Sequence, residues 1–163
     1  IQYPARVYPV GRLDKDSEGL LLMTNQGELA NEIMHAGNFH EKEYLVTVDQ
    51  PFNAAFLKKM REGVELKELG VTTRPCKVEA AGVKTFRIIL TQGLNRQIRR
   101  MCAELGYRVV TLKRVRIMNI HLGKLNTGDF RRATPKELEE LEWQLEQARL
   151  EREEAELLAG QDE

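Results

Sequence analysis

Asp14 follows Arg12 by two positions in the segment GRLD (residues 11–14), just ahead of a continuous apolar run over residues 20–23. The run has the length of a buried strand, and Gly27 marks the turn after it. Asp14 is therefore expected on a loop held against the core, where a desolvated carboxylate can act as a nucleophile or a base. In such a turn the same aspartate could instead cap the following segment or pair with Arg12, and the motif alone favours that structural role.

A cation for this acid is predicted on a helix over residues 96–105. Apolar residues recur there at the spacing of one helix face: Ile98, Met101, Cys102 and Leu105. The other side carries three arginines: Arg96, Arg99 and Arg100. Arg99 lies nearest the seam between the two faces, so it can reach an internal carboxylate and keep Asp14 ionised through a bidentate pair. The alternative is a solvated arginine face, which the pattern alone favours.

A flat surface is available at Tyr44, in the segment KEYLVTV (residues 42–48). The segment alternates in the manner of a strand that is partly buried on both faces. A tyrosine at the start of a strand usually packs in or beside the core, so the structural role is the default for Tyr44.

The segments over residues 11–27, 42–48 and 93–101 together resemble the catalytic domain of the RsuA-type ribosomal RNA pseudouridine synthases. The resemblance extends from Tyr8 to Leu141. Within the family the chain is most similar to the synthases of 23S ribosomal RNA. The marks of that subgroup are the stretch HAGNFHEKEY from His35 and the arginine-rich third motif.

The resemblance implies an enzyme that breaks the bond between the ribose anomeric carbon and the uracil nitrogen, rotates the base and rejoins it through carbon. This isomerisation needs no cofactor. Asp14 matches the catalytic aspartate of the family, and Arg99 matches the basic residue that pairs with it. Tyr44 matches the tyrosine that stacks on the flipped uracil, and Ile98 lies beside and under that base in the family. Stacking suits a base taken out of its helix.

Further basic residues are expected to contact the RNA. Arg12 is expected to hold the space left by the flipped nucleotide or to bind phosphate, and Lys42 to support the site or contact the RNA backbone. Phosphate contacts that position the RNA are also expected from Arg96, Arg100, Lys113, Arg114, Arg116, Arg131 and Arg132. Ser17 stands where the family commonly has threonine, and serine retains the hydroxyl of that residue. Asp16 and Glu18 are expected on the outer surface of the loop.

The net charge of the 163-residue chain is zero, but the charges are unevenly placed. Residues 135–163 carry 3 basic and 11 acidic side chains, whereas residues 1–134 carry 22 basic and 14 acidic ones. Residues 96–132 alone hold 10 basic and 2 acidic side chains. A basic body suits a polyphosphate partner, because each neutralised phosphate releases counterions. An unevenly charged solvated surface is the plainer interpretation, and charge alone favours nucleic acid only slightly.

Composition argues against several classes of protein. No apolar stretch is long enough to span a membrane, so we expect no membrane partner. Cys76 and Cys102 are too few and too far apart for a disulfide scaffold or a metal site, and we expect both in the core of a cytoplasmic protein. The three histidines have no ligand-like spacing: His35, His40 and His121. We expect no bound metal. We also expect a monomer, with structured 23S ribosomal RNA and a transfer RNA as candidate partners.

Short strands dominate the predicted elements, and helices interrupt them. The strands are expected near residues 8–10, 20–24, 44–48, 75–80, 85–91 and 107–122. The helices are expected over residues 28–35 with Gly37 near the end, 53–62 with Gly63 at the end, and 96–105. Their order does not repeat as a βαβ series, so the predicted fold class is α+β, with a mixed, largely antiparallel sheet and flanking helices. The resemblance implies the same fold with a central active-site cleft.

The last predicted helix starts at Thr134, with Pro135 at its first position and Glu137 completing a capping box. One face of this helix is expected to pack on the body: Leu138, Leu141, Leu145 and Ala148. We divide the chain into a catalytic domain over residues 1–148 and a charged tail, helical or disordered, over residues 149–163. Members of the family usually have an N-terminal RNA-binding domain and an opening strand with a Lys-Pro pair, and we expect both to be absent here.

Three functions stay open on the residues. The first is an enzyme that isomerises uridine with Asp14, Arg99 and Tyr44. The second is a module that holds ribosomal RNA without turnover. The third is another cofactor-free enzyme acting on a nucleoside or sugar, but a glycoside hydrolase needs two carboxylates facing one bond and no second acid is evident. An Asp14–Arg99 pair facing an open basic cleft would support the first, and an Asp14 sealed under side chains would argue against it.

Overall fold

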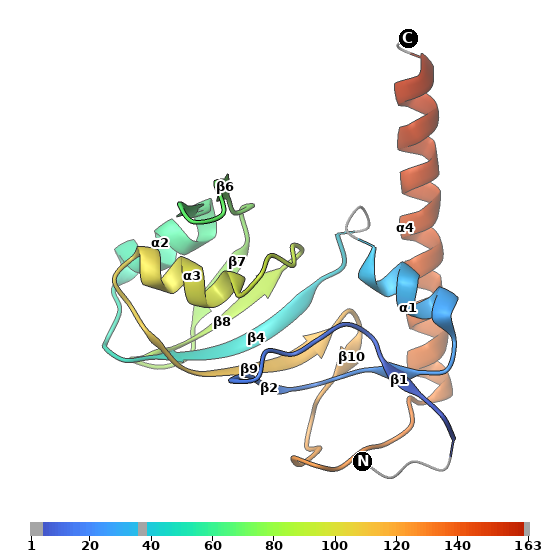
Figure 1. Cartoon of the computed structure of the whole chain (residues 1–163), viewed down its shortest axis with the longest axis horizontal. Helices are drawn as coiled ribbons and strands as arrows, with labels where there is room; N and C mark the ends of the chain where they lie inside the picture. Colours follow the sequence, from blue (N-terminus) through green and yellow to red (C-terminus); the bar gives the residue numbers. More distant parts are fainter. Residues whose placement is uncertain (1–4, 36–38, 162–163) are drawn as a thin grey trace.

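Strand β4 (Lys42–Val48) lies at the centre of the main sheet in the computed structural model, which describes residues 5–35 and 39–161. Its two neighbours are β8 (Thr85–Leu90) and β9 (Val109–Ile117), and it runs antiparallel to both. Figure 1 shows these three strands crossing the molecule. The predicted strand over residues 44–48 is therefore confirmed, and it begins two residues earlier than expected.

Three shorter strands complete this sheet. β7 (Lys77–Ala80) pairs antiparallel with β8, and β10 (Ile120–His121) pairs antiparallel with β9. β2 (Glu18–Gly19) pairs with β9 in parallel. The sheet is mixed and largely antiparallel, so the predicted α+β class is confirmed. The predicted hairpin between residues 75–80 and 85–91 is present as β7 and β8.

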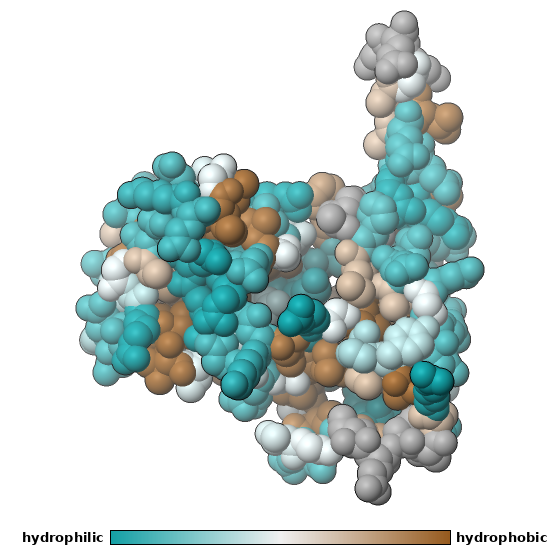
Figure 2. All heavy atoms as spheres, viewed as in Figure 1, coloured by the Kyte–Doolittle hydropathy of each residue, from teal (hydrophilic) through white to brown (hydrophobic). Residues whose placement is uncertain are grey.

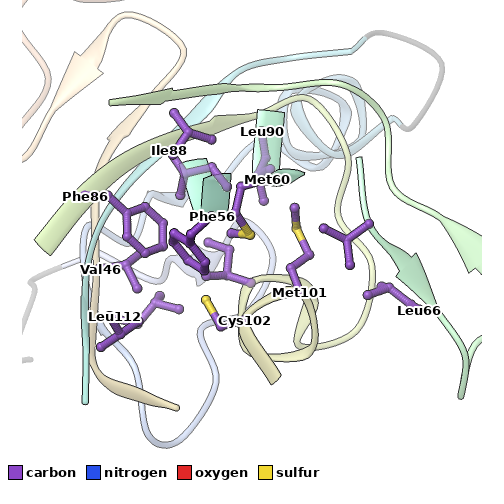
Figure 3. Packing of buried hydrophobic residues seen from close by; sticks show 14 residues of the cluster. Val46, Phe56, Met60, Leu66, Phe86, Ile88, Leu90, Met101, Cys102 and Leu112 are labelled. Carbon is purple, nitrogen blue, oxygen red and sulfur yellow. The ribbon is translucent and has the colours of Figure 1, made fainter. Parts of the chain in front are cut away.

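Helices α2 (Ala54–Glu62) and α3 (Gln97–Glu104) cover one part of the sheet (Figure 1). Between the helices and the strands lies the larger hydrophobic core, drawn in Figure 3. Phe86 of β8 is fully buried there, and its ring lies 5.5 Å from that of Phe56, centroid to centroid. Three of the four predicted core residues of α3 are buried in this cluster, namely Ile98, Met101 and Cys102.

The ends of α2 follow from two residues. Asn53 caps the first turn, because its side-chain oxygen accepts a hydrogen bond from the backbone N–H of Phe56 at 2.9 Å. Gly63 ends the helix at a φ of 111°, a conformation that disfavours side chains. A short antiparallel ladder of β5 (Glu65–Leu66) and β6 (Val71–Thr72) follows the helix.

A second, smaller core joins α1 (Gly27–Met34), the ends of β9 and β10, and α4 (Pro135–Gln161). Leu141 and Leu145 of α4 are buried in it, as predicted. Leu138 is exposed, contrary to the prediction, because it lies in the first turn of α4, before the helix meets this core. Gly37, expected near the end of α1, lies outside the described residues.

Helix α4 starts with the predicted capping box. Glu137 N–H donates to Thr134 Oγ1 at 3.1 Å, and Thr134 N–H donates to Glu137 Oε1 at 2.8 Å. The helix runs without interruption to Gln161, and Figure 1 shows its C-terminal part projecting beyond the body. Over the described ranges, no helix has both the length and the apolar character needed to cross a membrane.

The apolar run over residues 20–23 is not one buried strand, which corrects the prediction. The chain pairs first with β9 through β2, and then with β1 (Tyr8–Pro9) through β3 (Met23–Thr24). Leu20 is buried, whereas Leu21 is exposed. A short apolar segment cannot reveal that its pairing partner changes midway, since the change depends on strands far away in the sequence.

Gly19 is the residue that allows β2 to lie against β9. Its φ is +119°, and a Cβ atom on it would lie 2.2 Å from the backbone oxygen of Arg114. Only glycine fits so close an approach between two backbones. The Asp14 loop is therefore attached to the main sheet at a site that tolerates no side chain.

We predict that Gly19→Ala lowers the free energy of unfolding by about 3 kcal/mol, the sum of left-handed backbone strain and overpacking. The matched control is Gly128→Ala, where φ is +86° and no heavy atom lies within 4 Å of an added Cβ. That variant should lose only about 1 kcal/mol from backbone strain. Urea unfolding followed by circular dichroism measures both, and equal losses would contradict the close-approach explanation.

Candidate active site

The predicted site residues meet at a cleft of about 520 Å³. Its walls come from the loop over residues 11–17, from β4, and from the loop and first turn that lead into α3. Figure 2 shows the mostly hydrophilic surface of the face viewed, and the hollow between the α2–α3 part and the α1–α4 part. Eight of the predicted site residues line the cleft: Arg12, Asp14, Lys42, Tyr44, Arg96, Ile98, Arg99 and Arg114.

The Asp14 carboxylate is open to this cleft, with a side-chain exposure of 42%. The loop that carries it is closed by a hydrogen bond from Ser17 N–H to the Asp14 carbonyl at 2.9 Å. The nearest cation is Arg96, whose Nη1 lies 3.9 Å from Asp14 Oδ2. Asp14 is thus neither sealed under side chains nor paired only within its own loop.

Arg99 does not pair with Asp14 as the sequence predicted. Its Nη2 donates to the Asp16 carbonyl at 2.7 Å and to Ser17 Oγ at 3.4 Å. Over the part of the chain that the structure describes, no hydrogen bond or ion pair joins Asp14 to Arg99. The Nε of Arg99 is buried without a hydrogen bond, 3.5 Å from Asp16 Oδ1. Arg99 therefore holds the backbone of the Asp14 loop through Nη2, and its Nε–H makes no hydrogen bond.

Asp16 is exposed on the loop, as expected, and does not line the cleft, but it binds an arginine that does. Its two carboxylate oxygens accept hydrogen bonds from Nη1 and Nη2 of Arg96, at 3.0 and 2.8 Å. The Arg96 guanidinium holds the pKa of the Asp16 carboxyl at about 2. The sequence contains no local sign of this contact, because 80 positions separate the two residues.

The backbone of Arg96, whose side chain binds Asp16, is strained. Arg96 precedes the first residue of α3 and has a φ of 48°, which is uncommon for a residue other than glycine, asparagine or aspartate. Strained residues persist where surrounding contacts hold them, and they cluster at functional sites. The bidentate pair with Asp16 is such a contact.

Tyr44 and Ile98 provide the flat and apolar wall of the cleft. Tyr44 is half-buried on β4, opposite Ile88 of β8 and Arg114 of β9. Ile98 is buried in the first turn of α3 and belongs to the larger core. Lys42 stands two residues before Tyr44, and burial lowers the pKa of its ammonium.

Arg114 and Arg116 were expected to contact RNA phosphates. Both side chains instead bind partners within the protein. Arg114 is 5% exposed, and its Nε donates to the Leu20 carbonyl at 2.9 Å. Arg116 binds Glu43 at 3.1 Å and Glu41 at 3.3 Å. Because side chains alternate along a strand, a basic run on β9 cannot present all its charges to one partner. Lys113, between Val109 and Ile117 on the same strand, is exposed but does not line the cleft.

The other predicted RNA contacts lie outside the cleft. Arg100 forms an ion pair with Glu68 and donates from Nε to the Asn95 carbonyl at 2.9 Å. Arg131 and Arg132 precede α4, where Arg131 forms a bidentate pair with Glu137 at 2.7 and 2.9 Å. This charged neighbour holds the pKa of Glu137 at about 2.

Two polar residues that line the cleft were not predicted from the sequence as site residues. Gln97 is buried, accepts a hydrogen bond from Leu94 N–H at 3.2 Å, and so shapes the loop before α3. His40 lines the cleft with a buried Nε2 that has no hydrogen-bond partner, and burial lowers its pKa. Neither stood out, because a polar residue at a helix start and a lone histidine are common on surfaces.

The two cysteines are free: Cys76 is half-buried and Cys102 is buried. Burial raises the pKa of Cys76 to about 11 and that of Cys102 to about 12. Over residues 5–35 and 39–161, no group of three or more His, Cys, Asp or Glu side chains is placed to hold a metal ion. The side chains that line the cleft include a carboxylate, arginines, a lysine, histidines and an aromatic ring.

Comparison with known proteins identifies relatives of this chain. The family profile of RNA pseudouridylate synthase matches residues 2–104. The dual-specificity RNA pseudouridine synthase RluF of Escherichia coli is 52% identical over 141 residues, which are 86% of this chain and 48% of that protein. The ribosomal large subunit pseudouridine synthase B of Bacillus subtilis is 38% identical over 144 residues, covering 85% of this chain and 58% of that protein.

A crystal structure of a pseudouridylate synthase superposes with a TM-score of 0.82 at 33% identity. The match covers 86% of this chain and 63% of the other. The fold implied by the resemblance is thus confirmed. The chain spans about half the length of the curated relatives it matches.

We predict that Asp16 titrates near pH 2 in the intact protein and near its ordinary value of 3.8 in an Arg96→Ala variant. Because folding lowers the pKa of Asp16, its pair with Arg96 stabilises the folded state above about pH 4. This contribution is lost as the pH falls toward 2. Carboxyl-detected NMR follows the titration. An unchanged midpoint in the variant would contradict Arg96 as the main cause.

Proposed function

Because the chain belongs to the RNA pseudouridylate synthase family, we propose that it converts a specific uridine of 23S ribosomal RNA to pseudouridine. The observation that carries this proposal is the open Asp14 carboxylate in a cleft that also holds Arg96, Arg99 and Tyr44. These groups come from three separate segments of the chain. Their convergence supplies an acid, cations and a flat surface at one place.

In the proposed reaction the bond from the ribose anomeric carbon to the uracil N1 breaks, and the same carbon then bonds to C5. The proton lost from C5 is balanced by one gained at N1, so no redox partner or group donor is needed. Asp14 acts at the sugar as nucleophile or base, for which its exposed carboxylate is suited. Arg99 and Arg96 keep positive charge beside it, which favours its ionised form.

Tyr44 and Ile98 hold the detached base in this proposal. A uracil ring has apolar faces, so it can stack on the half-buried tyrosine while the buried isoleucine packs against its edge. The base must leave its helix to reach them, as enzymes that act on a base require. Arg12, which lines the cleft, would hold the space that the base vacates or bind a phosphate.

The RNA class follows from the relatives and from charge. The names of the two relatives specify a dual-specificity RNA pseudouridine synthase and a ribosomal large subunit pseudouridine synthase. These names support an RNA substrate, and we propose a structured stem-loop of 23S ribosomal RNA, with a transfer RNA as a second substrate. Arg100, Lys113, Arg131 and Arg132 are the proposed backbone contacts outside the cleft.

The working unit is proposed to be a cytoplasmic monomer. Residues 1–148 form the catalytic domain in this proposal. Residues 149–163 add an acidic extension to it.

We predict that Asp14→Asn lowers the rate of pseudouridine formation at least a thousandfold, because the amide retains the size of the side chain but has no negative charge. The substrate is 23S ribosomal RNA that lacks pseudouridines, and carbodiimide labelling with primer extension locates the product. The matched control is Glu18→Gln, which removes an exposed carboxylate of the same segment that does not line the cleft.

A new primer-extension stop that is lost in Asp14→Asn and retained in Glu18→Gln supports the reaction, the acid and the target uridine. Modification by Asp14→Asn at the rate of the unsubstituted chain would refute the proposed role of Asp14. RNA binding without a stop in either protein would make the chain a binding module.

A further inference from the structure

Two carboxylates of one loop face the same arginine in the cleft. Asp16 receives both terminal nitrogens of Arg96 at 3.0 and 2.8 Å, which are hydrogen-bond distances. Asp14 lies 3.9 Å from the nearer of those nitrogens, which is an ion-pair contact without a hydrogen bond. The two acids thus share one guanidinium, and Asp16 holds it.

Occupation of Arg96 by Asp16 has a direct effect on Asp14. A guanidinium that binds a carboxylate in bidentate fashion engages both of its oxygens. If Asp14 received Arg96 in this way, neither oxygen would be open to a substrate. With Arg96 bound to Asp16, Asp14 keeps a 42% exposed side chain with positive charge nearby.

Residue 16 also fixes the second arginine of the cleft. Its backbone carbonyl accepts from Arg99 Nη2 at 2.7 Å, and its carboxylate lies 3.5 Å from Arg99 Nε. The side chain of this one residue contacts both arginines, and its backbone carbonyl binds Arg99 alone. A substitution of the side chain removes the ion pair with Arg99 Nε and is expected to retain the hydrogen bond from Arg99 Nη2 to the carbonyl.

We propose that Asp16 is a positioning residue that engages both terminal nitrogens of Arg96, so that Arg96 makes no hydrogen bond to Asp14 and leaves the reactive carboxylate uncovered. The inference rests on the proposed function, because it assigns Asp14 the reactive role. Asp16 itself does not line the cleft. In its absence the closest remaining carboxylate for Arg96 is Asp14.

The test is a comparison of Asp16→Asn with the double variant Asp16→Asn and Arg96→Ala. The amide of the first has the shape of the carboxylate but no charge, and one of its two terminal atoms cannot accept a hydrogen bond. Arg96 is then expected to bind Asp14, which lowers kcat at saturating RNA about tenfold to a hundredfold. Removal of Arg96 as well should restore kcat to within about threefold of the Arg96→Ala single variant.

A matched control is Glu68→Gln. It removes an exposed carboxylate, between β5 and β6, that pairs with Arg100 of α3. Glu68 does not line the cleft. Its kcat at saturating RNA should stay unchanged. Thermal unfolding of every variant shows whether each is folded at the assay temperature. A purely structural role of Asp16 predicts that Asp16→Asn lowers kcat by the same factor in the Arg96→Ala background as in the unsubstituted chain, and that result would overturn the inference.

A crystal structure of Asp16→Asn tests the inference without any activity measurement. It is expected to show Arg96 within hydrogen-bond distance of Asp14, and an Arg96 that stays beside residue 16 or turns to solvent would overturn it. An unsubstituted chain without activity would instead refute the proposed function. The two failures are therefore distinguishable.

Discussion

The contact between the start of α3 and the loop over residues 14–17 determines the arrangement of the cleft. The bonded residues of the two segments are 80 to 83 positions apart along the chain, and the arginines of the first contact the acid and carbonyl groups of the second. A charge-assisted bidentate pair is stronger and more directional than a neutral hydrogen bond. It fixes the distance between the loop and the helix as well as their orientation. The open side of Asp14 depends on this contact.

The sheet provides the base on which that contact forms. β4 carries Tyr44, and β9 anchors the Asp14 loop through the close pairing at Gly19 and through the buried side chain of Arg114. Nε of the buried Arg114 donates to a backbone carbonyl of the anchored segment, whereas its Nη2 is buried without a hydrogen-bond partner. The same arginine lines the cleft. Structural support and the candidate site are therefore parts of one network.

Periodicity in the sequence predicted the helices and the longer strands, but it failed for the apolar run over residues 20–23 and for the contacts between elements. The apolar spacing on α3 predicted its buried face, and Asn53 and Gly63 predicted both ends of α2. These features depend on residues within one or two turns of each other. The pairing of Asp16 with Arg96 depends on how the whole chain folds, so no local pattern contained it. The resemblance to a family brought the right segments together, but the partner of Arg99 in this chain could only be found in three dimensions.

Charge is distributed along α4 in a way that makes the molecule strongly dipolar. Residues 135–163 have eleven acids against three bases, the rest of the chain has the opposite excess, and the helix carries its charges beyond the body (Figure 1). At 1.5 Å per residue, 27 helical residues extend about 40 Å, several times the Debye length at physiological ionic strength. In the field of a polyanion such a molecule experiences a torque that turns the acidic end outward. The helix thereby favours encounters in which the basic body arrives first, and this orienting effect weakens as salt is added.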